Sequence, residues 1–191
     1  MAMWWFITSN ARCSYEELKR RRCLALGWRE LGNLAGYIRD DPKWERQFKT
    51  RIQLKGNLAY PHDRQWIEQD HAMTAVPELF WRFLNLPQHD YIVLLEAGSQ
   101  MTLGKTEVFA MARLHKPAIE SYRYDENYDH AHQIYDDLTW VDWDRARFGE
   151  LELPRVSFKS MLQDDAQLEQ VQRAWQEAQD EKKQSALTQQ G

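Results

Sequence analysis

Nine tryptophans are the unusual feature of this chain of 191 residues, and an exposed aromatic ring can stack on a planar ligand. Trp28 stands directly after an apolar run that ends in glycine, at the expected end of a strand. Tyr122 and Tyr124 lie in the polar segment 120–130, where folding alone gives little reason for several aromatic rings. Because an aromatic side chain can stack on a flat ligand, and gains about 1–3 kcal/mol with a nucleic-acid base, Trp28, Tyr122 and Tyr124 are candidate walls of a pocket. The alternatives are that Trp28 belongs to the core and that the tyrosines pack a loop.

The first apolar run, Trp4–Ile7, is followed by polar residues that could hydrogen-bond the edge of a base. Ser9 and Asn10 are the candidates, although an asparagine at this place can also satisfy the backbone of a turn. Adjacent side chains on a strand face opposite sides, so at most one of the two tryptophans in the run can face the pocket. We assign Trp5 to it.

Cations cluster at the end of the helix expected over 15–21, and they could neutralise backbone phosphates. The cluster comprises Lys19, Arg20, Arg21 and Arg22, with Arg12 upstream. The same cations would stabilise the carboxyl end of a helix without any ligand, or form a solvated surface. Lys and Arg outnumber Asp and Glu by 13 to 7 in residues 1–64, but are outnumbered by 22 to 12 in the rest of the chain. This asymmetry suits a protein that touches nucleic acid through one patch.

Enzyme-like patterns are weak in this sequence. His130 and His132 have the His-x-His spacing that could place two imidazoles on one side of a strand, but two ligands do not make a zinc site. No Ser-His-Asp or Cys-His arrangement is legible, and no glycine-rich segment has the spacing of a phosphate-binding loop. We therefore assign no catalytic residue, no cofactor and no metal from these patterns. A small hydrolase or nuclease is a distant alternative, for which Glu96, Lys105 and Glu107 are the nearest candidates.

The candidate residues need a framework of mixed helices and strands. Short apolar runs predict strands, and Ser14 followed by Glu17 forms a capping box that predicts a helix start. The expected strands cover 4–7, 23–26, 91–95, 107–114, 138–143 and 156–158, and the expected helices cover 15–21, 41–49, 65–71 and a segment that opens at Pro77. The 91–95 and 107–114 runs should pair as a hairpin. This order predicts an α+β fold, in which a curved mixed sheet or small open barrel has helices packed against it.

The composition changes after residue 158, which divides the chain into a domain over 1–158 and a C-terminal helix with a flexible tail over 159–191. Leu168, Val171 and Trp175 have helical spacing and form one thin apolar stripe. That stripe is too narrow to fold alone, so we expect it to pack on the body or to bind a partner. From Glu177 onward the Gln-, Lys- and Ser-rich chain is expected to be frayed.

No apolar run approaches the ~18 residues of a membrane-spanning helix, so no membrane partner is expected. Residues 1–13 lack the basic flank and apolar core of a signal peptide. Two cysteines, Cys13 and Cys23, are too few for a disulfide scaffold, and free thiols fit a reducing compartment. We therefore expect a cytoplasmic protein.

The apolar run 23–26, the Gly-Trp that follows it and the Leu-Gly-Asn-Leu of 31–34 form a segment that is frequent in one superfamily. With the segments 4–10, 80–95, 105–114 and 130–143, this part of the chain resembles the PUA-like superfamily, specifically the EVE and YTH-type modified-base readers. It is also similar to the amino-terminal domains of McrB-type restriction proteins. The likeness covers roughly residues 3–158 and departs from the pattern at His89-Asp90, where relatives often have Gly-Asp. The resemblance implies that Trp28 takes the place of a cage tryptophan and that the fold binds rather than catalyses.

A reader of this type would have to extrude the base from a duplex, which costs a few kcal/mol. Stacking offsets that cost, and a methyl group buried between rings adds about 0.8 kcal/mol. We therefore expect a nucleic-acid-binding module that reads a flipped, methylated base, on DNA rather than RNA, in a bacterial defence or restriction system with an effector protein. The alternative is a protein-interaction module that docks a partner through the acidic C-terminal half and the terminal helix.

Overall fold

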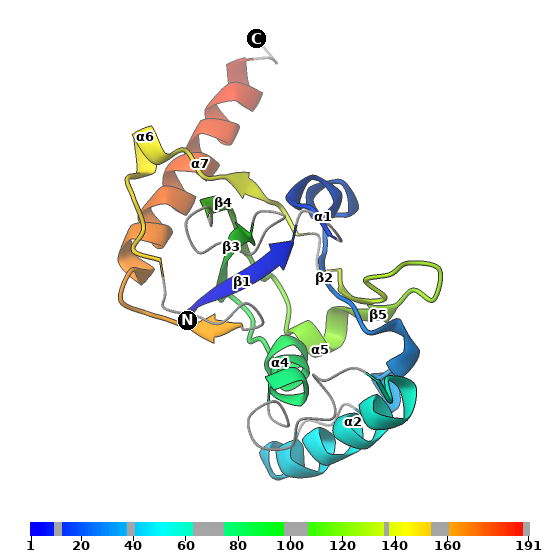
Figure 1. Ribbon diagram of the computed structural model, residues 1–191. Helices are drawn as coiled ribbons and strands as arrows, with labels where there is room; N and C mark the ends of the chain where they lie inside the picture. The colour runs from blue at the N-terminus through cyan, green and yellow to red at the C-terminus, as the bar shows by residue number, and fades with distance from the viewer. Residues whose placement is uncertain are drawn as a thin grey trace.

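Two β-sheets and the helices packed around them form the described part of the chain (Figure 1). The computed structural model describes residues 1–9, 13–37, 41–62, 75–97, 107–135, 138–153 and 161–188. The predictions for Asn10, Arg12 and Lys105, for a helix over 65–71 and for a strand over 156–158 lie outside the described residues.

A five-stranded mixed sheet has the strand order β7-β4-β3-β1-β8. β1 and β3 are parallel, with Met3 opposite Tyr91, and the remaining neighbours are antiparallel. The predicted hairpin is confirmed as the β3–β4 pair. The predicted strand over 138–143 is reduced to two residues, because only Val141 and Asp142 pair with β4, opposite Met111 and Ala110. The strands are β1 (Met3–Ser9), β3 (Tyr91–Ala97), β4 (Glu107–Arg113), β7 (Val141–Asp142) and β8 (Leu162–Gln163).

A second, antiparallel sheet has the order β2-β6-β5. Its strands are β2 (Leu24–Leu26), β5 (Tyr122–Tyr124) and β6 (His132–Ile134). The tyrosines that the sequence suggested for a loop therefore lie on a strand, and strand pairing fixes their directions. The α+β class is confirmed, and the described strands are divided between two sheets rather than joined in one closed barrel.

Helices surround both sheets, and their starts follow local signals. Ser14 caps the first helix as predicted, because its hydroxyl accepts a hydrogen bond from the backbone N–H of Glu17 at 3.3 Å. The helix expected over 41–49 begins as a 3-10 turn and continues as α2 to Ala59, since Phe48, Ile52 and Gly56 extend its buried face at intervals of four. The α-helices are α1 (Tyr15–Arg21), α2 (Glu45–Ala59), α4 (Ala75–Leu84), α5 (Ala118–Ser121), α6 (Arg145–Phe148) and α7 (Leu168–Thr188), and the 3-10 turns are η1 (Arg29–Leu31), η2 (Ala35–Tyr37) and η3 (Pro42–Trp44).

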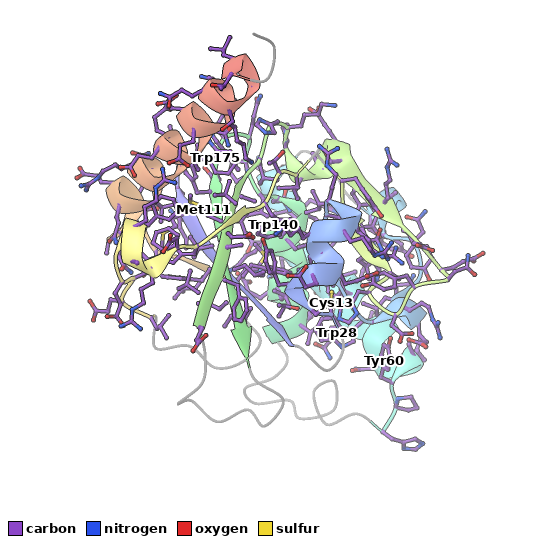
Figure 2. All side chains as sticks on the ribbon, turned by 90° about the horizontal axis from the view of Figure 1, so that it is seen from above. Cys13, Trp28, Tyr60, Met111, Trp140 and Trp175 are labelled. Carbon is purple, nitrogen blue, oxygen red and sulfur yellow. The ribbon has the colours of Figure 1, made fainter. Side chains whose placement is uncertain are left out.

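The five-stranded sheet is covered on both faces by separate groups of apolar side chains. Phe6 and Leu94 face a core shared with α1, α2, α4 and the second sheet. Trp5 and Val93, one residue earlier on each strand, face the other core, which α7 closes. Figure 2 accordingly shows Trp175 and Trp28 on opposite sides of the molecule.

Helix α7 is part of this second core. Val171, Ala174, Trp175 and Ala178 are buried against the sheet, so the apolar stripe packs on the body, which is one of the two outcomes expected for it. Where fraying was expected from Glu177, the helix instead continues to Thr188, and its end projects from the body in Figure 1. Gln and Lys are good helix formers even when they bury nothing.

Replacing Trp175 with Ala should lower the free energy of unfolding by about 3–5 kcal/mol, because it leaves a cavity between α7 and the sheet. Urea unfolding followed by circular dichroism measures this loss. Leu187→Ala is the matched control, since Leu187 is 72% exposed near the end of the same helix. We expect that control to stay within about 0.5 kcal/mol of the wild type. Equal effects of the two variants would show that α7 does not belong to the folded body.

Candidate functional site

Trp28 has a backbone conformation that bulky residues rarely adopt. Its φ of 61° and ψ of 48° lie in the left-handed region. Trp28 stands one residue beyond the end of β2 and directly before η1. For a residue with a Cβ this conformation costs about 1–2 kcal/mol. Strained backbone of this kind is found preferentially at functional sites, where the surrounding structure holds it in place.

A chain of hydrogen bonds holds Trp28 in that conformation. The carbonyl of Trp28 lies 3.2 Å from Nε2 of His132 and also accepts the N–H of Leu31 at 3.0 Å. On the other side of the ring, Nδ1 of His132 lies 2.8 Å from the hydroxyl of Tyr122, which accepts the N–H of Leu34 at 3.1 Å. A carbonyl can only accept, so Nε2 of His132 carries the proton and Nδ1 accepts from the tyrosine.

The charge state of His132 agrees with this assignment. The side chain is completely buried, and burial lowers the pKa of His132 to about 4, although the hydrogen bond to Trp28 acts in the opposite direction. The positive charge of Lys55 lowers this pKa further. His132 is therefore neutral at physiological pH, as its two hydrogen bonds require.

Aromatic rings gather around His132, and we call the group Trp28, Phe80, Tyr122, Tyr124 and His132 the aromatic cluster. Phe80 contacts both Trp28 and His132 edge-on, with ring centroids 5.6 Å and 4.8 Å apart. Phe80 and His132 are buried, whereas the remaining three rings are half-buried. The hydroxyl of Tyr124 donates to the carbonyl of Arg29 at 2.8 Å, so both tyrosine hydroxyls are already used within the protein. What the cluster offers a ligand is ring surface.

The structure thus brings together three of the residues predicted for the pocket, Trp28, Tyr122 and Tyr124. Phe80 and His132 were missed as members, since an apolar helix position and a lone His-x-His give no signal for an aromatic site. Their part depends on contacts between α4 and β6 that are distant in sequence.

Trp5 lies elsewhere. Its side chain is completely buried in the core that α7 closes, and its indole N–H donates to Asp164 at 3.1 Å. Trp4 is the tryptophan of β1 that packs on the same core as Trp28, and its indole N–H donates to Asp90 at 2.8 Å. The structure therefore does not bring Trp5 to the aromatic cluster. Ser9 ends β1 opposite Ala97.

The cations at the end of α1 are paired with carboxylates of the protein. Lys19 lies 2.9 Å from Asp142, and Arg20 and Arg21 lie 2.7 Å and 2.6 Å from Glu17. Hydrogen bonds from Arg20 and then Arg21 lower the pKa of Glu17 to about 2.

Arg21 also stacks above the ring of Tyr128 at 3.7 Å and reaches Asp125 at 3.5 Å. Arg22 ends the helix in a left-handed conformation, with a φ of 54°. A phosphate would have to compete with the protein's own carboxylates for most of these cations, so phosphate binding by this cluster stays a prediction.

The two cysteines are buried, and neither is set up as a nucleophile. Burial raises the pKa of the Cys13 thiol, and it raises the pKa of Cys23 to about 12. Both thiols are therefore protonated at neutral pH, while the thiolate is the nucleophilic form. Within the described segments, no three His, Cys, Asp or Glu side chains lie close enough to share a metal ion.

A groove of about 450 Å³ opens between β7, α6 and α7. It carries charges of both signs, and Arg147 within it is paired with Glu181 at 2.6 Å and stacked on Phe148 at 4.8 Å. The groove offers no exposed pair of rings, and it lies on the α7 side of the molecule, away from the aromatic cluster. A ligand that stacks would find its surface at Trp28 rather than here.

Comparison with known proteins gives no match to a protein-family model, a curated protein or a solved structure. Among the helices of the described residues, none combines the length and apolarity needed to cross a membrane. The resemblance to the PUA-like modified-base readers therefore stays a prediction.

The stability of the protein should fall between pH 6.5 and pH 4 because of His132. In this window the unfolded chain binds a proton on His132 and the folded protein does not, so the free energy of unfolding decreases as the pH falls. Between these two pH values the free energy of unfolding falls by about 3 kcal/mol because of His132, and above pH 6.5 His132 causes no loss. Urea unfolding at a series of pH values measures it.

His132→Gln should be less stable than the wild type at pH 7 but nearly independent of pH between 5 and 6.5. His115→Gln, at an exposed position, is the matched control and should keep the wild-type profile. A wild-type profile that is flat over this range would mean that His132 is not held neutral by burial.

Proposed function

We propose that this protein binds nucleic acid and holds one extruded, modified base against Trp28 in the aromatic cluster. The observation that carries the proposal is a half-buried tryptophan held in a strained backbone conformation by a buried, neutral histidine. A core tryptophan would be served equally well by ordinary backbone geometry. A ligand-binding ring gains from being fixed in advance, because ordering a mobile side chain on binding costs about 0.5–1.5 kcal/mol.

The energetics of base extrusion favour a site of this kind. Extrusion costs a few kcal/mol, and one or two stacked rings return about 1–3 kcal/mol per base. Burying a methyl group against the rings adds about 0.8 kcal/mol. That gain corresponds to a preference of about fourfold for a methylated base. The remaining affinity must come from contacts with the strand that carries the base.

The proposal includes the finer predictions of fold and setting. In it the two-sheet α+β body is a PUA-like, EVE or YTH-type reader, DNA is preferred to RNA, and the protein acts in a cytoplasmic defence or restriction system with an effector protein. Support comes from the position of Trp28, which lies one residue beyond β2 and contacts Phe80 of α4. Those two segments belong to the part of the sequence that resembles the family.

The alternatives receive less support from the described residues. A protein-interaction module was expected to dock a partner through the acidic C-terminal half and the terminal helix. The apolar stripe of that helix is not available to a partner, because Val171 and Trp175 are buried against the sheet. The charged outer face of this helix, with Glu169, Arg173 and Glu177, and its exposed end over 181–188 are still available to a partner. A hydrolase with a thiol nucleophile is not supported, because both cysteine thiols are buried and protonated.

Replacing Trp28 separates a binding role from a core role. Trp28→Gly removes the ring and also relieves the left-handed backbone, which glycine adopts readily. Binding to an oligonucleotide with one methylated base should weaken by about 1–3 kcal/mol, or about 5- to 150-fold. The thermal midpoint should stay near the wild-type value. Fluorescence anisotropy measures binding, and circular dichroism measures the midpoint.

Trp28→Phe is the control that keeps a ring in place, and it should retain most of the affinity. A thermal midpoint far below that of the wild type in both variants would assign Trp28 to the core. Normal midpoints with unaltered binding would remove Trp28 from the site and with it the proposed function.

A further inference from the structure

Helix α2 carries a second set of cations, arranged differently from those of α1. Arg51 and Lys55 are four residues apart and therefore lie on one face of the helix. The guanidinium of Arg51 lies 4.8 Å from the ring of Trp44 and 6.0 Å from that of Tyr37, and the ammonium of Lys55 lies 5.0 Å from the ring of Tyr37. We call these four residues the α2 patch.

The cations of the α2 patch differ from Lys49 of the same helix in their ion pairing. Throughout the described ranges, no Asp or Glu forms an ion pair with Arg51 or Lys55, whereas Lys49 of the same helix is paired with Glu45 and Glu78. Two like charges at this spacing oppose each other and weaken a helix. The aromatic rings beneath them offset part of this cost, but the positive charge itself stays available to an anion.

The geometry of Arg51 suits a phosphate in particular. The guanidinium of Arg51 lies over the ring of Trp44, and the indole N–H of Trp44 donates to the backbone carbonyl of Tyr37 at 2.8 Å, which fixes the indole. A guanidinium has its N–H groups in one plane, where two of them can bind two oxygens of one phosphate. Arg51 is exposed, so an anion in solution can reach it.

The α2 patch is adjacent to the aromatic cluster. Lys55 donates to the carbonyl of Leu31 at 2.6 Å, and Leu31 ends the 3-10 turn that begins directly after Trp28. The hydroxyl of Tyr60, just beyond α2, accepts the N–H of Glu30 in the same turn at 3.1 Å. Figure 2 shows Trp28 and Tyr60 close together at this end of the molecule. Lys55 is also near enough to His132 for its positive charge to lower the pKa of the imidazole.

We infer that the α2 patch binds the backbone phosphates of the nucleotides next to the base held by Trp28, in place of the cation cluster of α1. This inference rests on the proposed function. Its occupant is a nucleic-acid strand, because uncompensated cations stacked on aromatic rings beside a ring-lined site match alternating phosphates and bases. The α1 cations, in contrast, already have Glu17, Asp125 and Asp142 as partners.

The test is the salt dependence of binding by the double variant Arg51→Gln with Lys55→Gln. The probe is a single-stranded DNA oligonucleotide with one methylated base, and the unmethylated oligonucleotide is run in parallel. A plot of log affinity against log salt has a slope of about -0.7 for each phosphate neutralised on a single strand. Loss of two contacts should therefore make the slope shallower by about 1.4, with an unchanged thermal midpoint.

Two further variants serve as controls. Arg173→Gln with Lys183→Gln removes the same charge from α7, on the other side of the molecule, and should leave the slope unchanged. The triple variant Arg20→Ala, Arg21→Ala and Arg22→Ala should also keep the wild-type slope if α1 does not hold phosphates. A slope that becomes shallower only in the α1 variant overturns the inference, as does binding of the wild type to anionic vesicles but to no oligonucleotide.

The outcomes distinguish this inference from the proposed function. In one outcome, the wild type binds methylated and unmethylated oligonucleotides equally and Trp28→Gly binds as well as the wild type, but the α2 variant has a shallower slope. Base reading is then wrong, and phosphate binding by the α2 patch is supported. If base discrimination is intact and the α2 variant keeps the wild-type slope, the α2 patch is wrong and base reading stands. No binding to any oligonucleotide overturns both.

Discussion

The parallel pairing of β1 with β3 places both strands inside the five-stranded sheet, where each face must be covered. Strands in this position read as continuous apolar runs, and Tyr91–Leu95 is one. Two layers follow from this constraint. Helix α7 covers the face with Trp5 and Val93, and α4 with the second sheet covers the face with Phe6 and Leu94. The C-terminal helix α7 is therefore part of the folded body, because it covers one face of the sheet.

The aromatic cluster is a consequence of how the second face is covered. Covering it buries β6, and with it the imidazole of His132 beneath Phe80. A buried imidazole needs a hydrogen-bond partner on each nitrogen. One partner is the hydroxyl of Tyr122, and the other is the carbonyl of Trp28, which is available only because Trp28 turns out of the strand in a left-handed conformation. The hydrogen bonds of His132 offset the backbone strain at Trp28. Formation of the core therefore also fixes the position of the Trp28 ring.

Much of the framework could be predicted from the sequence, because it depends on local patterns. The runs at β1, β2, β3 and β4, the cap at Ser14 and the hairpin all follow from apolar spacing and capping chemistry. What could not be predicted depends on pairing between distant segments. Strand β5 has a polar sequence, and its partner β6 makes it a strand. Period-two alternation shows that Trp4 and Trp5 face opposite ways, but it does not say which face meets the second sheet.

The two sets of cations show the same limit for charge. In the sequence, Lys19–Arg22 is the conspicuous cluster, and Arg51 with Lys55 is inconspicuous. Folding reverses their availability, since Asp142 reaches Lys19 from 123 residues away and Asp125 reaches Arg21 from 104 residues away, while Arg51 and Lys55 meet rings instead of carboxylates. A cation over a ring keeps its full charge, because the ring's attraction is that of a quadrupole and not of an opposite charge. Among the described residues, Arg51 and Lys55 thus provide positive charge without a carboxylate partner near Trp28, and the proposed nucleic-acid strand would meet cations and rings at the same place.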